Sequence, residues 1–201
     1  MLAINLHNFA RLWLTGLIIT SCISCADTKS QELMDFENAA SQKIKALATN
    51  LKKELSTSMQ NGGPVVAVAN CKLKAPEITQ QLNSDDEIKI RRTSLRVRNP
   101  DNAADTWELK VLNTFEEKLS AGTPIQELVY SEELKQDDKT TYRMMRAIPA
   151  QALCLTCHGD KQNMSNELIE KLAQDYPNDQ ATGFSAGDIR GAFSVSQTIS
   201  H

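Results

Sequence analysis

Apolar residues recur every three or four positions over a long stretch near the start of the chain. Between residues 31 and 59 they form one stripe, with lysines and glutamates opposite: Leu33, Phe36, Ala40, Ile44, Leu47, Leu51 and Leu55. This spacing predicts a long amphipathic helix with one buried face. The glycine pair within 61–63 ends that helix, and Pro64 suits the first turn of a second helix. The second helix carries Cys71, and Pro76 interrupts or restarts it.

Later stretches of the chain alternate between apolar and polar residues. This alternation predicts strands over 88–94, 127–134, 140–148 and 188–196. Asp105 and Glu108 have the spacing of a capping box at the start of a helix that ends before Gly122. A shorter helix is predicted over 166–174. Helices combined with several short strands that can pair antiparallel favour an α+β domain with a helical N-terminal part.

The first 25 residues have the pattern of a targeting signal. One basic residue, Arg11, precedes an apolar run over 12–19 that is too short to span a bilayer, and small residues follow. A buried N-terminal helix is the alternative, but the apolar pattern stops at Thr20. We therefore expect a secretory or lipoprotein signal over 1–25 and a folded domain over 31–198.

The cleavage of this signal has three alternatives. The residues before Cys22 resemble a bacterial lipobox, in which the cysteine becomes the lipidated first residue of the mature chain. Cys25 fits that pattern less well, and ordinary cleavage after Ala26 would remove both cysteines. We favour lipidation of Cys22, which predicts a periplasmic protein anchored to a bacterial membrane.

Composition narrows the class of protein. The chain of 201 residues suits one domain that can bury a core without disulfides. Its 22 basic and 25 acidic residues give a net charge of −3, which argues against a nucleic-acid partner. We expect contact with a membrane only through the lipid anchor, and a redox or signalling partner that the sequence does not identify.

The sequence Cys154-Leu155-Thr156-Cys157-His158 is the most specific chemical pattern in the chain. Two thiols three positions apart can form thioethers with the two vinyl groups of a haem, and the adjacent histidine then meets the iron. Such attachment takes place outside the bacterial cytoplasm, which agrees with the expected export. We therefore predict one covalently bound haem c, attached at Cys154 and Cys157, with His158 as one iron ligand.

Three other roles for this cysteine pair fit the sequence less well. A thioredoxin-like redox pair requires a βαβ setting, which the predicted elements do not supply. A zinc site needs a second pair of ligands, and no second C-x-x-C or H-x-H follows the signal segment. A structural disulfide at this spacing would be strained.

The second iron ligand stays open when the residues alone are considered. His7 lies in the signal segment, and His201 is the last residue and reaches the iron only if the tail folds back. Methionines are possible ligands, although they more often fill cores. The methionines concerned are Met34, Met59, Met144, Met145 and Met164. Cys71 is the remaining thiol of the predicted domain, and a buried, inert cysteine is the alternative role for it.

Several separate blocks occur in a characteristic order. They are Gly63-Pro64, Cys71 with Ala75-Pro76, Arg92-Thr93-Ser94, Arg98-Asn99-Pro100, Trp107-Glu108, Cys154 to Gly159, and a last block from Tyr176-Pro177 through Ala181, Gly183, Gly187-Asp188, Arg190-Gly191 and Ser194-Val195. In these blocks the chain resembles the single-haem c-type proteins whose haem domain has a PAS-like fold, catalogued as a domain of unknown function. The resemblance extends from about Met34 to Gln197.

The resemblance implies a PAS-like antiparallel sheet with a long N-terminal helix and flanking helices. It also implies His158 and Cys71 as the two axial ligands. Asn70 is polar where we expect an apolar residue, so it either touches the ligand sulfur or faces outward. Arginines pair with carboxylates, so those in the matched blocks are candidate contacts of the haem propionates, with surface or turn roles as the alternative. The candidates are Arg92, Arg98 and Arg190.

Histidine and thiolate ligands would occupy both faces of one iron and favour its ferric state, which predicts a low reduction potential. We therefore expect an exported monohaem cytochrome-like protein that acts in low-potential electron transfer or redox sensing. The alternative is a haem-based sensor of diatomic gases, in which Cys71 is displaced and a separate partner reads the change. An enzyme would need an open iron position and distal acid–base groups, so we expect no enzymatic activity.

Overall fold

A computed structural model describes residues 29–84 and 87–201, so the predicted signal segment with Cys22 and Cys25 lies outside the described residues. The elements are α1 (Gln31–Asn83), β1 (Lys89–Thr93), α2 (Thr106–Ser120), β2 (Val129–Gln136), β3 (Lys139–Pro149), α3 (Ala152–His158), α4 (Asn166–Asp175) and β4 (Ile189–Ser200), with 3-10 turns at Pro100–Asn102, Ile125–Glu127 and Lys161–Asn163. Within these two stretches, no helix is long and apolar enough to cross a membrane.

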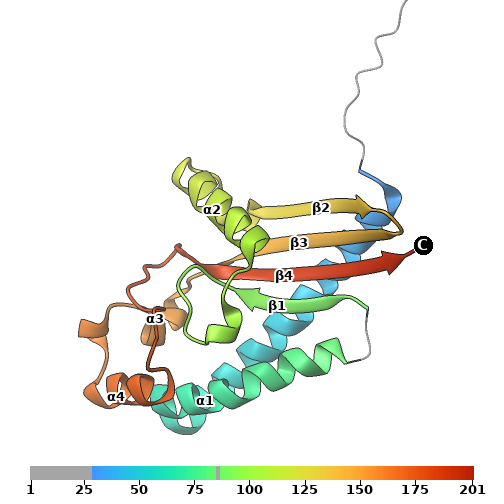
Figure 1. The fold of residues 1–201 in the computed structure, drawn as a ribbon. Helices are drawn as coiled ribbons and strands as arrows, with labels where there is room; N and C mark the ends of the chain where they lie inside the picture. Colours follow the sequence, from blue (N-terminus) through green and yellow to red (C-terminus); the bar gives the residue numbers. More distant parts are fainter. Residues whose placement is uncertain (1–28, 85–86) are drawn as a thin grey trace, which may run out of the picture.

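The strands form one antiparallel sheet in the order β1-β4-β3-β2 (Figure 1). All the strands expected from alternation are present, and the last one extends beyond its predicted end to Ser200. β2 and β3 join in a two-residue turn in which Asp137 has φ of 51°, a left-handed conformation that aspartate tolerates. The prediction of an α+β domain with an antiparallel sheet and a long N-terminal helix is confirmed.

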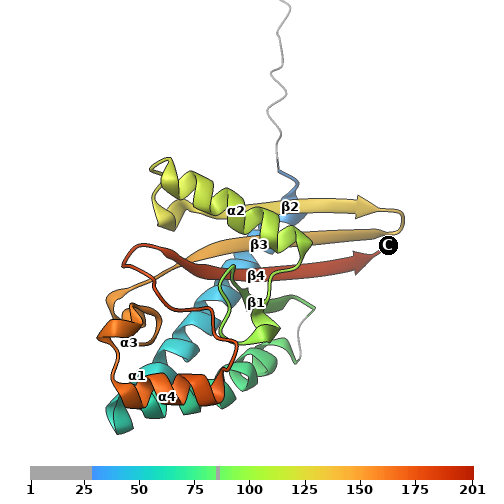
Figure 2. The ribbon, with the colours of Figure 1, turned by 60° about the vertical axis from the view of Figure 1, so that its left-hand side comes forward.

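Helix α1 is broken at Gly62 and Gly63, whose backbone angles are not helical. The predicted break is therefore present, and the second segment of α1 runs back towards the start of β1 (Figures 1 and 2). Gly63 has φ of 69°, which a residue with a Cβ adopts only under strain. The predicted interruption at Pro76 is wrong, because the helix continues to Asn83. Pro76 is exposed, so the backbone hydrogen bond that it removes lies at the surface of the helix.

The sheet is covered on both faces, which gives three layers. The first segment of α1 packs its predicted stripe against one face; the buried members of this cluster are Leu33, Phe36, Ala40, Ile44, Leu47, Ile90, Tyr142, Met144, Phe193 and Val195. Helix α2 covers part of the other face through a cluster that includes Phe115, Met145 and Ala192. The two faces follow from strand alternation, since neighbouring residues such as Phe193 and Ser194 point to opposite sides.

Helix α2 begins at the predicted capping box. The backbone N–H of Glu108 donates to Asp105 at 2.7 Å, and the N–H of Asp105 donates to the Glu108 carboxylate at 3.0 Å. Glu108 is only 2% exposed, and its carboxylate also pairs with Arg91 at 2.7 Å. Trp107 in the first turn of α2 is half-buried, packs against the same cluster as Phe115 and lies beside Tyr130 of β2.

Candidate functional site

A cavity of about 500 Å³ lies between the two segments of α1, the sheet, α3 and the chain that leads to β4. Its volume lies within the range of pockets that hold small molecules and cofactors. All seven residues predicted to contact a cofactor within the domain line this cavity: Cys71, Arg92, Arg98, Cys154, Cys157, His158 and Arg190. The fold therefore brings together residues from distant parts of the sequence.

The C-x-x-C-H sequence forms helix α3 on one wall of the cavity. Cys154 and Cys157 are free thiols, both half-buried, and both line the cavity. Gly159 ends the helix, and a Cβ there would lie 2.6 Å from the carbonyl oxygen of Leu155. The residue after His158 must therefore be a glycine, because the preceding turn of α3 comes too close for a side chain.

His158 is held in one orientation by the chain that precedes β4. Its Nδ1 lies 2.7 Å from the carbonyl oxygen of Ala181, so Nδ1 carries the proton and donates it to that carbonyl. Phe184 lies edge-on to the imidazole, with 6.3 Å between the ring centroids. Burial is the main cause that holds the pKa of His158 well below its usual range. The imidazole is therefore neutral, and its Nε2 lone pair is available to a metal.

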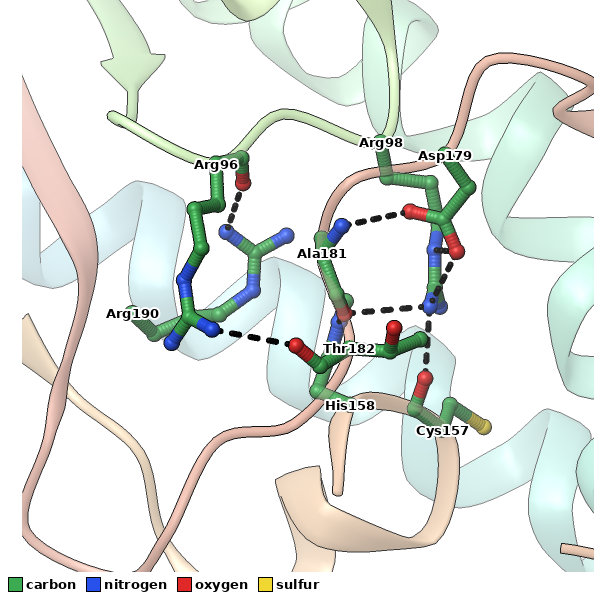
Figure 3. Close-up of polar contacts among 8 residues, drawn as sticks. All are labelled: Arg96, Arg98, Cys157, His158, Asp179, Ala181, Thr182 and Arg190. Carbon is green, nitrogen blue, oxygen red and sulfur yellow. Dashed lines mark hydrogen bonds and ion pairs between the residues drawn. The ribbon is translucent and has the colours of Figure 1, made fainter. Parts of the chain in front are cut away.

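Arg98 fixes α3 to the segment that orients His158 (Figure 3). Its guanidinium donates to the carbonyl oxygen of Cys157 at 2.6 Å and to that of Ala181 at 3.3 Å. It also forms an ion pair with Asp179 at 2.9 Å. The Asp179 carboxylate accepts a further bond from the N–H of Ala181 at 2.8 Å. These contacts give Arg98 a positioning role. Only the guanidinium N–H groups that these contacts do not use could make the predicted contact with a propionate.

Asp179 was not singled out from the sequence, although it lies in the block between Tyr176 and Ala181 that carried the resemblance. The sequence clue is an acidic residue two positions before Ala181, the spacing at which an aspartate accepts from the backbone. Arg96 was also missed. It donates to the carbonyl oxygen of Thr182 at 3.1 Å, and its guanidinium lies 3.6 Å from the centroid of Phe184.

Arg190 and Arg92 supply positive charge to the cavity wall. Arg190 donates to the hydroxyl of Ser94 at 3.2 Å and to the carbonyl of Arg96 at 3.3 Å, while its buried Nε has no partner among the described residues. Burial lowers the pKa of Arg190 to about 10 and also lowers that of Arg92. The side chain of Arg92 lines the cavity and forms no hydrogen bond or ion pair with the residues that the structure describes. Desolvated guanidinium groups that have no counter-charge beside them fit a cofactor that carries carboxylates.

Cys71 lies on the second segment of α1 and is half-buried. Burial raises the pKa of its thiol, the charge of Glu54 raises it further, and Arg92 and Arg98 act in the opposite direction. Neither expectation for Asn70 is met, since its side-chain amide donates to Ser58 at 3.0 Å. The Ser58 hydroxyl in turn donates to Glu54 at 3.0 Å. This chain of bonds ties the helix that carries Cys71 to the first segment of α1.

The other candidate iron ligands lie mostly elsewhere. The His201 ring bonds to Thr140 at 2.9 Å, at the end of the sheet away from α3 (Figures 1 and 2). Met144, Met145 and Met164 are buried in hydrophobic clusters, whereas Met59 lines the cavity. The described residues contain no group of three or more His, Cys, Asp or Glu side chains that could hold a metal ion by themselves.

Comparison with known proteins identifies the family to which the chain belongs. Among curated proteins, no sequence relative of the chain is found. Among solved structures, the crystal structure of the cyanobacterial haem protein Tll0287 is similar, with a TM-score of 0.57 and 24% sequence identity over 86% of this chain and 98% of that chain. This similarity concerns the fold. The profile of the Tll0287-like family matches residues 20–198, and the chain belongs to that family.

Proposed function

We propose that this chain binds one haem in the cavity beside α3, covalently through Cys154 and Cys157, with the iron between His158 and Cys71. The observation that carries the proposal is the convergence of these four residues and of the cationic wall in one cavity of about 500 Å³. The description of Tll0287 as a haem protein supports the same choice of cofactor. When bound, a haem supplies an iron that exchanges one electron between its ferric and ferrous states.

The residues of the chain are suited to hold such a group. The carbonyl of Ala181 fixes the tautomer of His158, which leaves Nε2 to donate to a metal. Arg92 and the buried Nε of Arg190 are donors without partners among the described residues, and carboxylates would satisfy both. Positive charge from Arg92 and Arg98 favours the thiolate form of Cys71 against the effect of burial.

A protein with these two ligands would act in low-potential electron transfer or in redox sensing. Thiolate donation stabilises ferric iron, and histidine on the opposite side leaves no position for a substrate. We therefore infer that the chain is a redox protein without enzymatic activity. We also propose that it is exported and anchored by lipid at Cys22, because covalent haem attachment in bacteria takes place outside the cytoplasm.

A sensor of diatomic gases is the second candidate, and one observation favours it. Burial raises the pKa of the Cys71 thiol, so a sulfur released from the iron would take up a proton and stay neutral inside the protein. In this case a gas would replace Cys71, and a partner protein would respond to the change.

Denaturing electrophoresis with haem staining tests the covalent part of the proposal. The full chain is expressed with export and a haem-attachment system, and we expect a stained band. The Cys154→Ser, Cys157→Ser double variant should lose the stain. Cys71→Ser is the matched control, because it removes a thiol from the same cavity and should keep the stain. A stained band from the double variant would contradict the thioether assignment.

Redox titration with and without carbon monoxide separates the two functions. For an electron carrier we expect a reversible one-electron transition at low potential and no spectral change when carbon monoxide is added to the reduced protein. Ready binding of carbon monoxide would support the sensor. A high potential, typical of a histidine and methionine pair, would contradict Cys71 as ligand and point to Met59.

A further inference from the structure

The side chain of Asn70 joins the two segments of α1 across the glycine break, directly before Cys71. Its amide donates to the Ser58 hydroxyl at 3.0 Å, and that hydroxyl donates to the Glu54 carboxylate at 3.0 Å. We propose that Asn70 and Ser58 form a latch that positions Cys71 at the iron and limits its displacement by a diatomic ligand. This inference rests on the proposed function, because it takes the iron to lie between His158 and Cys71.

The glycine break makes the position of Cys71 depend on contacts between the two segments of α1. Gly62 and Gly63 have backbone angles outside the helical range, with φ of −174° and 69°. Because the helix is interrupted there, its backbone does not fix the angle between the segments. Cys71 lies about two helical turns beyond Gly63, so a change in this angle moves its sulfur relative to the cavity.

The candidate haem cavity lies between the same two segments (Figure 2). Met59 of the first segment and Cys71 of the second segment both line it. Ser58 precedes Met59 and Asn70 precedes Cys71, so the latch ties one wall of the cavity to the other. When a ligand displaces Cys71, the second segment moves away from the first and the bond between Asn70 and Ser58 breaks.

The burial of Ser58 gives this bond its effect. Ser58 is only 1% exposed, so water does not readily replace a partner that its hydroxyl loses. The bond is made when Cys71 binds the iron and is lost when Cys71 leaves, so it shifts the equilibrium towards the bound state. A net contribution typical of a neutral hydrogen bond corresponds to about fivefold in that equilibrium.

Asn70 can be replaced without removal of the other contacts of its segment. Val68 shares a buried cluster with Leu168 of α4, and the Lys72 ammonium lies 3.6 Å from the Asp175 carboxylate. These contacts should keep the segment folded in Asn70→Leu. Leucine also supplies the apolar residue that we expected at this position, and it removes the bond to the first segment.

Cyanide titration of the ferric full chain with haem attached, followed by absorption spectroscopy, tests the proposal. A bond from the iron to the cyanide carbon replaces the bond to the Cys71 sulfur, and the iron keeps its oxidation state. We expect Asn70→Leu to bind cyanide about fivefold more tightly than the original chain. Ser58→Ala should show a similar gain. The double variant should gain no more than either single variant, because both changes remove the same bond.

Gln80→Leu is the matched control, because it also replaces a side-chain amide by leucine, at an exposed position of the same segment. Its cyanide affinity should stay within about twofold of the original. A role of Asn70 in stability alone would lower the unfolding free energy and leave the cyanide affinity unchanged.

The ferric spectrum of Cys71→Ala separates this proposal from the proposed function. An unchanged spectrum in that variant would overturn the ligand assignment and the latch together. With a changed spectrum, three results would overturn the latch alone. They are no displacement by cyanide in the original chain or in any latch variant, unchanged affinity in both Asn70→Leu and Ser58→Ala, and fully additive gains in the double variant.

Discussion

The ion pair between Arg98 and Asp179 should be the most sensitive electrostatic contact of the described fold. The side chains of Arg98 and Asp179 are 10% and 7% exposed, and their closest N–O distance is 2.9 Å. Arg98 also holds the carbonyl of Cys157, while Asp179 holds the N–H of Ala181. The pair therefore links α3 to the segment that orients His158.

Replacement of Asp179 by alanine leaves a buried guanidinium without its counter-charge. Removal of one member of a buried pair costs about 3 to 5 kcal/mol. Arg98 keeps two carbonyl acceptors, so we expect the lower end, about 3 kcal/mol of unfolding free energy. Asp179→Asn keeps an acceptor for the N–H of Ala181 and loses only the charge, so it should cost about 1 to 2 kcal/mol.

Urea denaturation followed by circular dichroism measures both changes. Asp138→Ala, in the exposed turn between β2 and β3, is the control and should change the unfolding free energy by less than about 0.5 kcal/mol. A loss below about 1 kcal/mol for Asp179→Ala, equal to that of Asp179→Asn, would refute the reasoning, because the pair would then behave as an exposed one.

Three further predictions concern stability. Gly191→Ala should lower the unfolding free energy by more than about 2 kcal/mol in urea denaturation, because the new Cβ would lie 2.3 Å from a carbonyl oxygen of β1. Gly187→Ala is the control: its Cβ meets open space, so it should cost about 1 kcal/mol. Equal losses in the two variants would contradict this reasoning. Glu108→Ala should cost about 3 kcal/mol in the same assay, since it removes both a cap and the partner of a buried contact, and a loss under 1 kcal/mol would count against it. In the chain without haem, the pKa of His158 is depressed in the folded state, so the unfolded chain binds the extra proton below about pH 6.5. The contribution of His158 to stability then falls by up to about 1.4 kcal/mol per pH unit. Urea midpoints between pH 7.5 and 5.5 measure this fall, His201→Gln should retain it, and a flat profile would contradict it.

Local patterns predicted much of this fold because their physical causes lie close together in sequence. The stripe from Leu33 to Leu55 repeats at helical spacing, and its N-terminal part fills the core beneath the sheet. The capping box of Asp105 and Glu108 needs only three residues of separation. The same holds for the cysteine pair and the histidine of α3, which one short helix carries together.

The remaining features depend on contacts between distant segments. Arg98 and Asp179 are 81 positions apart, and nothing near either residue indicates its partner. The continuation of α1 through Pro76 depends on which side of the helix is exposed, which the tertiary structure decides. The position of Cys71 in the cavity followed from a resemblance, because the residues alone left Met59 and other ligands open.

The electron paramagnetic resonance spectrum of the ferric full chain, compared with that of Cys71→Ala, tests the central claim most directly. We predict a low-spin signal of the thiolate type for the original protein, and its loss in Cys71→Ala with the haem still attached to Cys154 and Cys157. An unchanged spectrum in Cys71→Ala would contradict the account, because the iron would then have a ligand other than Cys71.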